Sequence, residues 1–415
     1  MSEKALNIGF IGAGQCGGNI VNIFARRGYQ TMAINTAKSD LDNLTNIPQE
    51  NRILIRCGNL DGAGANPEIG YKGLMEHGEE VLEQMKNVFS DDIDMIYVCA
   101  GLGRGSGSGI APAMLSLLTA DEEQREEEGL KKRGVGAIVT YPAENESPRI
   151  KIIANKSFTE ITQIDGVGST IVIDNNKRDK NASVKEQYDE INKRIAEELC
   201  SINRLAAIPS EVAYDARDFL TALLYPGNMA LFTVEIDQLD QDLEMNILQK
   251  LEQTYKKSVN LETEFDHAYG CAFLFEIPKT TKDIVTESLI SKMKNVFGNP
   301  FEDYYGIYEK DGRNNPKAKI HIVLYGMPYP QERILKDEQM LQENAQHYQE
   351  LQTKTQTQVF AGQGQNLFNN LIGEKKKKKQ PVTNPFSDLE FGSVETSKKP
   401  RGAKDLLSQM KKQVK

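Results

Sequence analysis

The chain lacks several features that mark common classes of protein. It has no tryptophan, only four histidines and only five cysteines among its 415 residues. No two cysteines have the spacing of metal ligands and the histidines do not cluster with them, which argues against a structural zinc site and against a disulfide framework. The cysteines are Cys16, Cys57, Cys99, Cys200 and Cys271.

Long apolar stretches are missing as well. No run of about 18 apolar residues occurs, so the sequence predicts no transmembrane helix. The first residues lead straight into a strand-like segment and lack the apolar centre of a signal peptide. We therefore expect a cytoplasmic protein with no membrane partner.

Charge is distributed unevenly along the chain. The net charge is −9, but residues 351–415 hold 13 basic and 5 acidic residues, whereas the other 350 hold 37 basic and 54 acidic ones. Five of the basic residues are consecutive lysines, Lys375–Lys379. We expect the acidic body to repel nucleic acid and the basic tail to attract an acidic partner. The alternative is that the lysine run only keeps a tail solvated.

Segments typical of strands and helices alternate through the first half of the sequence. Strand-like segments at 6–11, 30–35, 52–56, 93–100, 135–140 and 170–173 are separated by helical ones at 18–27, 71–89 and 112–120. This alternation predicts a parallel sheet with helices on both faces. The acidic run at 121–128 is predicted to be a solvated loop.

The second half begins with a long helix, predicted over 183–206, and then changes character. Strand candidates at 229–236, 269–277 and 319–325 enclose helices at 239–257 and 281–296, and a Gln-, Asn- and Lys-rich tail follows a last helix. The expected parts are a Rossmann-like ligand-binding domain (1–182), a central helix (183–207), a smaller α/β domain (208–330), a C-terminal helix (331–352) and a basic, mostly disordered tail (353–415).

The first chemical signal is a glycine-rich turn, Gly12–Asn19, between the first strand and the first helix. Backbone N–H groups at a helix N-terminus bind phosphate, and glycines let the backbone come close to the anion. By itself this turn is most typical of a dinucleotide-binding Rossmann domain, and a turn without any ligand is the other alternative.

A second turn of the same kind narrows these alternatives. Ala100–Gly109 holds five glycines in ten residues, again between a strand and a helix. Two such turns in one sheet can hold a polyphosphate from two sides, whereas a Rossmann NAD site needs only one and would end its second strand on an acid, where Asn35 and Thr36 stand. No lysine lies in either turn, so we expect helix dipoles, backbone amides and a metal ion to meet the phosphate charge.

Several segments resemble the tubulin/FtsZ family. The second turn is similar to its Gly-Gly-Gly-Thr-Gly-Ser/Thr-Gly signature, with Arg104 replacing the middle glycine and Ser106 the threonine. Gly14–Gly17 resembles the first loop of tubulin, Gly62–Gly70 the FtsZ loop near the γ-phosphate, and Ala33–Thr36 the loop after the second strand. The resemblance implies an α/β tubulin/FtsZ-like fold: a parallel-sheet GTP-binding domain, a long central helix, a smaller α/β GTPase-activating domain, a C-terminal helix and a disordered tail.

The resemblance also implies which residues bind GTP or GDP. Tyr188 and Asn192 share one helical face, where the family stacks an aromatic ring on guanine and contacts the base edge with a polar group. The alternative is a core-facing tyrosine and a solvated asparagine. Mg²⁺ would be held mainly by the phosphates and water. The implied nucleotide-binding residues are Gly14, Gln15, Cys16, Asn19, Asn35, Ala65, Asn66, Gly103, Arg104, Gly105, Ser106, Gly107, Ser108, Glu146, Arg149, Asn175, Tyr188 and Asn192.

Two acids after the long helix are the candidate catalytic residues. In the family the corresponding loop contacts the nucleotide of the next subunit, and FtsZ has Asn-x-Asp-Phe-Ala-Asp there; this chain has Ala213 for the Asn and keeps Asp215 and Asp218. Paired carboxylates can orient an attacking water and bind a cation. The resemblance thus implies a head-to-tail homopolymer that hydrolyses GTP between subunits. Helix capping is the alternative role for both acids.

The segment 174–180 and the basic tail resemble TubZ, the plasmid- and phage-encoded branch of the family that segregates DNA. That resemblance implies a bacterial or phage-infected host cytoplasm and a DNA-binding adaptor bound by the tail, with direct contact between lysines and DNA as another possibility. An FtsZ-type role in cell division shares the same chemistry and stays open.

Overall fold

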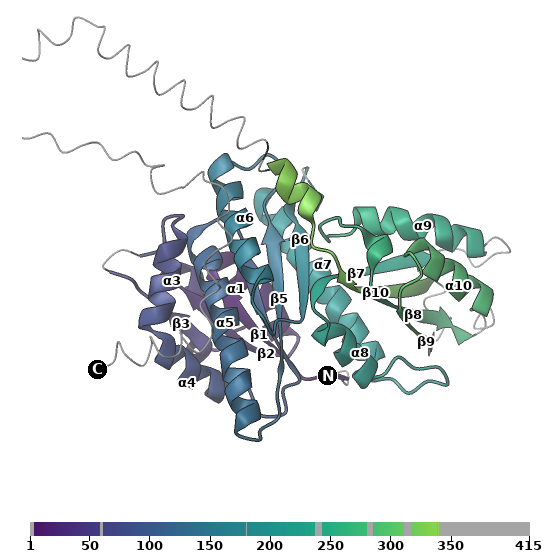
Figure 1. Ribbon diagram of the computed structural model, residues 1–415, viewed down its shortest axis with the longest axis horizontal. Helices are drawn as coiled ribbons and strands as arrows, with labels where there is room; N and C mark the ends of the chain where they lie inside the picture. The colour runs from purple at the N-terminus through teal and green to yellow at the C-terminus, as the bar shows by residue number, and fades with distance from the viewer. Residues whose placement is uncertain are drawn as a thin grey trace, which may run out of the picture. The chain divides into compact units, whose positions relative to one another are not determined.

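The structure is a computed structural model that describes residues 4–58, 61–179, 181–236, 243–279, 285–310, 317–337 and 339. Its described part up to Ile334 is one compact unit (Figure 1). Within it, ten strands form one sheet in the order β3-β2-β1-β4-β5-β6-β7-β10-β8-β9.

The strands are β1 (Ile8–Ala13), β2 (Gln30–Asn35), β3 (Arg52–Leu54), β4 (Met95–Gly101), β5 (Gly134–Tyr141), β6 (Ser169–Asp174), β7 (Gly227–Ile236), β8 (Gly270–Pro278), β9 (Glu302–Lys310) and β10 (Ala318–Met327). The labelled α-helices are α1 (Gly14–Arg26), α2 (Lys38–Asp42), α3 (Pro67–Glu76), α4 (Gly78–Val88), α5 (Gly105–Glu127), α6 (Pro148–Thr162), α7 (Val184–Leu205), α8 (Ala216–Leu224), α9 (Leu243–Lys257) and α10 (Glu287–Val296).

The strands of the first half are buried on both faces, as their nearly continuous apolar sequences require. In β4, Met95 and Tyr97 face one hydrophobic cluster while Ile96 and Val98 face the other. The first cluster is completed by α1, α7 and α8, and the second by α3, α4, α5 and α6. All pairings from β3 through β6 to β7 are parallel, which confirms the predicted parallel sheet with helices on both faces.

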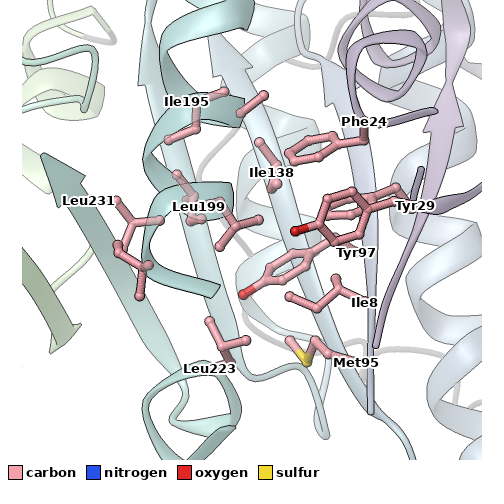
Figure 2. Close-up of a cluster of buried hydrophobic side chains, with 14 of the residues drawn as sticks. Ile8, Phe24, Tyr29, Met95, Tyr97, Ile138, Ile195, Leu199, Leu223 and Leu231 are labelled. Atoms are coloured by element: carbon pink, nitrogen blue, oxygen red, sulfur yellow. The ribbon is translucent and has the colours of Figure 1, made fainter. Parts of the chain in front are cut away.

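The central helix α7 packs on both halves of the sheet. Figure 2 shows its Ile195 and Leu199 between Tyr97 of β4 and Leu231 of β7. β7 continues the parallel sheet by pairing with β6 over three residues and then pairs antiparallel with β10. A third cluster, formed with α9 and α10, covers one face of this second half.

Several elements differ from the predictions. Strand β9 and helix α6 were not predicted; β9 lies at the sheet edge and carries charged residues at both of its ends. The helix start predicted at Asp215 and Asp218 is confirmed as the first turn of α8. The predicted helix 71–89 is two helices, α3 and α4, which meet at His77 and Gly78. Helices α1 and α5 begin at Gly14 and Gly105, inside the glycine turns rather than after them.

The run at 121–128, predicted as a solvated loop, is mostly exposed but is helical rather than a loop. The run continues α5 to Glu127, and the side chain of Glu122 is only 2% exposed. Its carboxylate accepts hydrogen bonds from the backbone N–H and the Nε of Arg133, at 2.7 and 2.6 Å. The buried acid of this run, Glu122, has its cationic partner eleven residues further along the chain, so the run by itself does not reveal the burial.

The C-terminal predictions fall mostly outside the described residues. Residues 331–337 are helical, at the start of the predicted helix 331–352, and the tail 353–415 lies outside the described part. Among the described residues no helix is both long and apolar enough to span a bilayer.

A buried histidine joins α7 to the second half of the sheet. His321 on β10 is 4% exposed; its Nδ1 lies 2.8 Å from Thr233 Oγ1, and its Nε2 lies 3.4 Å from Glu276 on β8. Glu198 of α7 lies 4.0 Å from the ring, and Arg204 of α7 binds Glu276 at 3.1 Å. Burial disfavours the imidazolium, but hydrogen bonds and charge from Glu198 and Glu276 outweigh it and raise the pKa of His321.

This histidine predicts a pH-dependent stability. A raised folded-state pKa adds stability that is complete below the unfolded value of about 6.5 and is lost as pH rises through the folded value. We expect the urea midpoint of the wild type to exceed that of His321→Gln more at pH 6 than at pH 9. His267→Gln, at an exposed histidine, is the control and should show no such change. An equal difference at both pH values for His321→Gln would contradict the prediction.

Candidate functional site

A cavity of about 1030 Å³ opens at the carboxyl ends of β1, β4, β5 and β6. This edge is where open parallel sheets bind ligands. Twelve of the residues proposed from the sequence line it. They are Gln15, Cys16, Asn19, Ala65, Arg104, Gly105, Ser106, Gly107, Glu146, Asn175, Tyr188 and Asn192.

Two helix N-termini meet at the floor of the cavity. The N-cap residues, Ala13 of α1 and Arg104 of α5, make no side-chain capping bond, and neither helix has an acid in its first turn. A side chain caps α3, α7, α8 and α10, whereas α2, α4 and α6 have no side-chain cap either, so what distinguishes α1 and α5 is that their N-termini open into the cavity. Uncapped N–H groups and the positive ends of two helix dipoles suit a polyanion.

Close contacts between backbones bring these two helices to the same place. A Cβ on Gly17 would lie 2.0 Å from the carbonyl oxygen of Cys99 at the end of β4. A Cβ on Gly107 would lie 2.5 Å from the oxygen of Gly101, and one on Gly14 2.7 Å from Gly107 N. The glycines, which the sequence interpretation assigned to ligand approach, therefore also allow the protein to pack against itself.

Six of the proposed residues are not among the residues that line the cavity. Gly14 lies against Gly107, Gly103 donates its N–H to Ser108 Oγ at 2.8 Å, and both Gly14 and Gly103 have positive φ. Asn66 caps α3 by accepting a bond from Glu68 N. These contacts shape the loops around the cavity.

The other two of these six residues, Asn35 and Arg149, form hydrogen bonds with neighbouring residues. The Asn35 side chain accepts the N–H of Thr36 at 2.7 Å and donates to Asp40 at 3.0 Å, and Arg149 donates to the oxygen of Ala65 at 3.4 Å. Asn35 is 2% exposed. Both residues hold groups that do line the cavity.

Two asparagines present unused polar groups at the α7 end of the cavity. Asn175 Oδ1 is buried without a hydrogen-bond partner. Asn192 is only 3% exposed, and no hydrogen bond of its side chain is found within the described part of the chain. A buried side-chain oxygen without a partner costs stability, so Asn175 suits a ligand that supplies the missing bond.

Sequence reasoning missed other lining residues. Asp40 receives bonds from Gln15 at 3.1 Å and from Asn35, and Thr140 pairs its hydroxyl with the Cys16 thiol at 3.5 Å. Asp189 also lines the cavity. Asp189 could have been found as the neighbour of Tyr188, but Asp40 and Thr140 carry no local motif.

The cavity itself offers little positive charge. Its charged lining residues are Asp40, Arg104, Glu146 and Asp189, and no lysine of the described chain lines it. Burial raises the pKa of the Cys16 thiol, despite the opposing bond with Thr140, and so keeps the thiol neutral. The described residues contain no group of three or more side chains that could together hold a metal ion.

The candidate catalytic acids lie outside this cavity. Asp215 is the N-cap of α8: its Oδ1 accepts the N–H groups of Arg217 and Asp218, at 2.7 and 3.0 Å, and Asp218 Oδ2 accepts Asp215 N–H at 3.1 Å. Burial and the charge of Asp215 raise the pKa of Asp218, against the bond from Asp215 N–H. The capping role is thus present, and each acid keeps a second oxygen with no bond to the described residues.

A parallel α/β sheet with two uncapped helix N-termini at one cavity defines a phosphate-binding α/β protein. Residues 7–182 match the Tubulin/FtsZ family, GTPase domain. This part of the chain is therefore a GTPase domain of the tubulin/FtsZ type.

Known proteins similar to the chain come from two branches of that family. A tubulin-like protein CetZ of Pyrococcus abyssi is 29% identical over 66% of this chain and 73% of its own length. A tubulin-like protein TubZ of Bacillus anthracis is 25% identical over 95% of this chain and 96% of its own. A structure described as a helical model of the TubZ-Bt two-stranded filament superimposes with a TM-score of 0.73 at 20% identity, covering 87% of this chain and 94% of that one.

The close contacts at the floor of the cavity predict that alanine affects stability differently at two neighbouring glycines. Gly17→Ala forces a backbone contact to open and should destabilise the protein by about 1–3 kcal/mol. Gly18→Ala meets only the Leu44 side chain, at 3.1 Å, and should be close to neutral because alanine favours the helix. Urea unfolding of both variants tests this, and equal midpoints would contradict it.

Proposed function

We propose that this GTPase binds GTP in the 1030 Å³ cavity, assembles head to tail and completes each catalytic site with acids of the next subunit. One observation carries the proposal. The cavity holds phosphate-binding helix N-termini, whereas Asp215 and Asp218 stand on α8, outside it. If a neighbouring copy supplied these two acids, they would meet the phosphates bound in the cavity.

The phosphates would lie on the N-termini of α1 and α5. Backbone N–H groups from Gln15 to Gly17 and from Gly105 to Gly107 would donate to their oxygens. Ser106, whose hydroxyl lies 2.7 Å from that of Thr36, is placed to donate as well, and Arg104 would add the one cation among the charged lining residues of the described chain. Since the other charged lining groups are acids, Mg²⁺ bound to phosphate and water would supply the remaining positive charge.

The base would lie at the α7 end of the cavity. Tyr188 offers a ring face for stacking, and Asn175 Oδ1 and the Asp189 carboxylate offer hydrogen-bond acceptors. Guanine presents two adjacent donors, N1–H and the N2 amino group, whereas adenine presents its N6 amino group beside the N1 acceptor, so a carboxylate at this end favours guanine. Asn192 would bind another polar group at the base edge.

In the assembled site, Asp215 and Asp218 would orient water toward the γ-phosphate. Their capping bonds with each other fix both carboxylates at the start of α8 and leave one oxygen of each without a partner among the described residues. A pair held in this way can accept a proton from the attacking water or bind a cation.

The substitution Asp218→Asn removes the carboxylate charge proposed for catalysis but keeps the capping hydrogen bond. Asparagine can still accept the Asp215 N–H, so α8 should stay capped while GTP turnover falls about 100-fold. Wild-type specific activity should rise with protein concentration, because the site forms only on assembly. GTP binding and filament pelleting are measured in parallel.

Glu186→Gln is the matched control. Glu186 is the acid of the capping box of α7 and receives the Ser183 N–H at 3.1 Å, as Asp218 receives that of Asp215. It should leave turnover unchanged. Wild-type turnover by Asp218→Asn, independent of concentration, would refute the shared site.

We further propose that the filament moves plasmid or phage DNA in the host cytoplasm through an adaptor bound by the basic tail. The support is the alignment with TubZ over 95% of the chain and the lysines at 375–379. An FtsZ-type role in cell division is the alternative, supported by 30% identity over 243 residues to the cell division protein FtsZ 2 of Methanocaldococcus jannaschii.

Removing residues 375–415 tests the role of the tail. The shortened chain should keep GTPase activity and filament formation but lose co-pelleting with adaptor–DNA complexes, because its main basic segment is gone. Replacing Lys375–Lys379 by glutamine tests the charge alone. Co-pelleting that matches the full chain would refute a tail role.

A further inference from the structure

Arg178, in the segment between β6 and α7, stacks on the ring of Tyr188. Its guanidinium carbon lies 4.5 Å from the ring centroid. Tyr188 lines the cavity, whereas Arg178 does not. The guanidinium thus covers one face of the Tyr188 ring and leaves the opposite face for a ligand.

The same side chain has a second contact at this end of the cavity. Arg178 Nε donates to the backbone oxygen of Asn175 at 2.6 Å. Asn175 also carries the buried side-chain oxygen that has no partner. The guanidinium of Arg178 thus contacts the ring of Tyr188 and the backbone of Asn175. These two cavity-lining residues come from different elements.

These contacts restrict groups that would otherwise move. Tyr188 is only partly buried, so its ring needs a partner to keep one orientation before a ligand arrives. A planar guanidinium stacks on an aromatic face while its N–H groups bond in the plane, which the ammonium of lysine cannot do. Fixing the ring in advance lowers the entropic cost of binding a flat ligand.

We propose that Arg178 is a positioning residue for the purine base. It holds the Tyr188 ring from behind and the Asn175 backbone in place, so that the base stacks on the free face of Tyr188 in an Arg–Tyr–base sandwich. The proposal rests on guanine-nucleotide binding in this cavity. It predicts that Arg178 contributes to binding of the base and not of the phosphates.

The test compares a ligand with a base and one without. Arg178→Ala should weaken GDP binding about fivefold, the scale of one cation–π contact, and leave tripolyphosphate binding unchanged. Arg178→Lys should recover only part of the loss. In a Tyr188→Leu background, Arg178→Ala should have little further effect, because the two residues act together.

Lys177→Ala is the matched control. Lys177 adjoins Arg178 but binds Glu262 at 2.5 Å, on another segment, and should leave both affinities unchanged. Urea unfolding checks that each variant is folded.

Three outcomes separate the proposals. A wild type that binds no GDP would overturn the proposed function. GDP binding by Arg178→Ala that equals the wild type would overturn this inference alone. Equal weakening of GDP and tripolyphosphate would also overturn it, because Arg178 would then support only the general fold.

Discussion

The site depends on a close contact between the first turn of α1 and the end of β4. Gly17 lies so near the carbonyl of Cys99 that any side chain would be 2.0 Å from its oxygen. With Gly107 against Gly101, this contact places the N-termini of α1 and α5 beside each other, at the carboxyl ends of adjacent strands. Two dipoles then act on one volume, where either helix alone would present half of the positive field.

This arrangement allows an acidic protein to hold a polyanion. The chain has a net charge of −9, and most charged groups around the cavity are carboxylates. Attraction comes from backbone N–H groups left without side-chain caps, while several other helices of the described chain are capped from their own sequence. Because partial charges at a helix end act over a short range, net charge is a poor guide to such a site.

Helix α7 connects the parts of the molecule. Over its 22 residues it carries Tyr188 and Asn192 to the cavity, Leu199 into the core and Glu198 to the buried His321. Its end leads toward α8 and the acid pair. Residues that line the cavity and residues that join the two halves of the sheet therefore sit on one continuous helix, which is stabilised by its capping box and by its apolar face in the core.

Local patterns in the sequence determined the alternating strands and helices of the first half, the long central helix and the two glycine turns, since periodicity and glycine spacing are written in neighbouring residues. Tertiary structure decided what depends on distant partners: the bond of Asp40 to Gln15, the pairing of Cys16 with Thr140 across 124 positions, and the burial of Glu122 against Arg133. It also decided that Gly17 serves packing as much as ligand approach. Such contacts arise only when the sheet brings strand ends together, and no short segment encodes them.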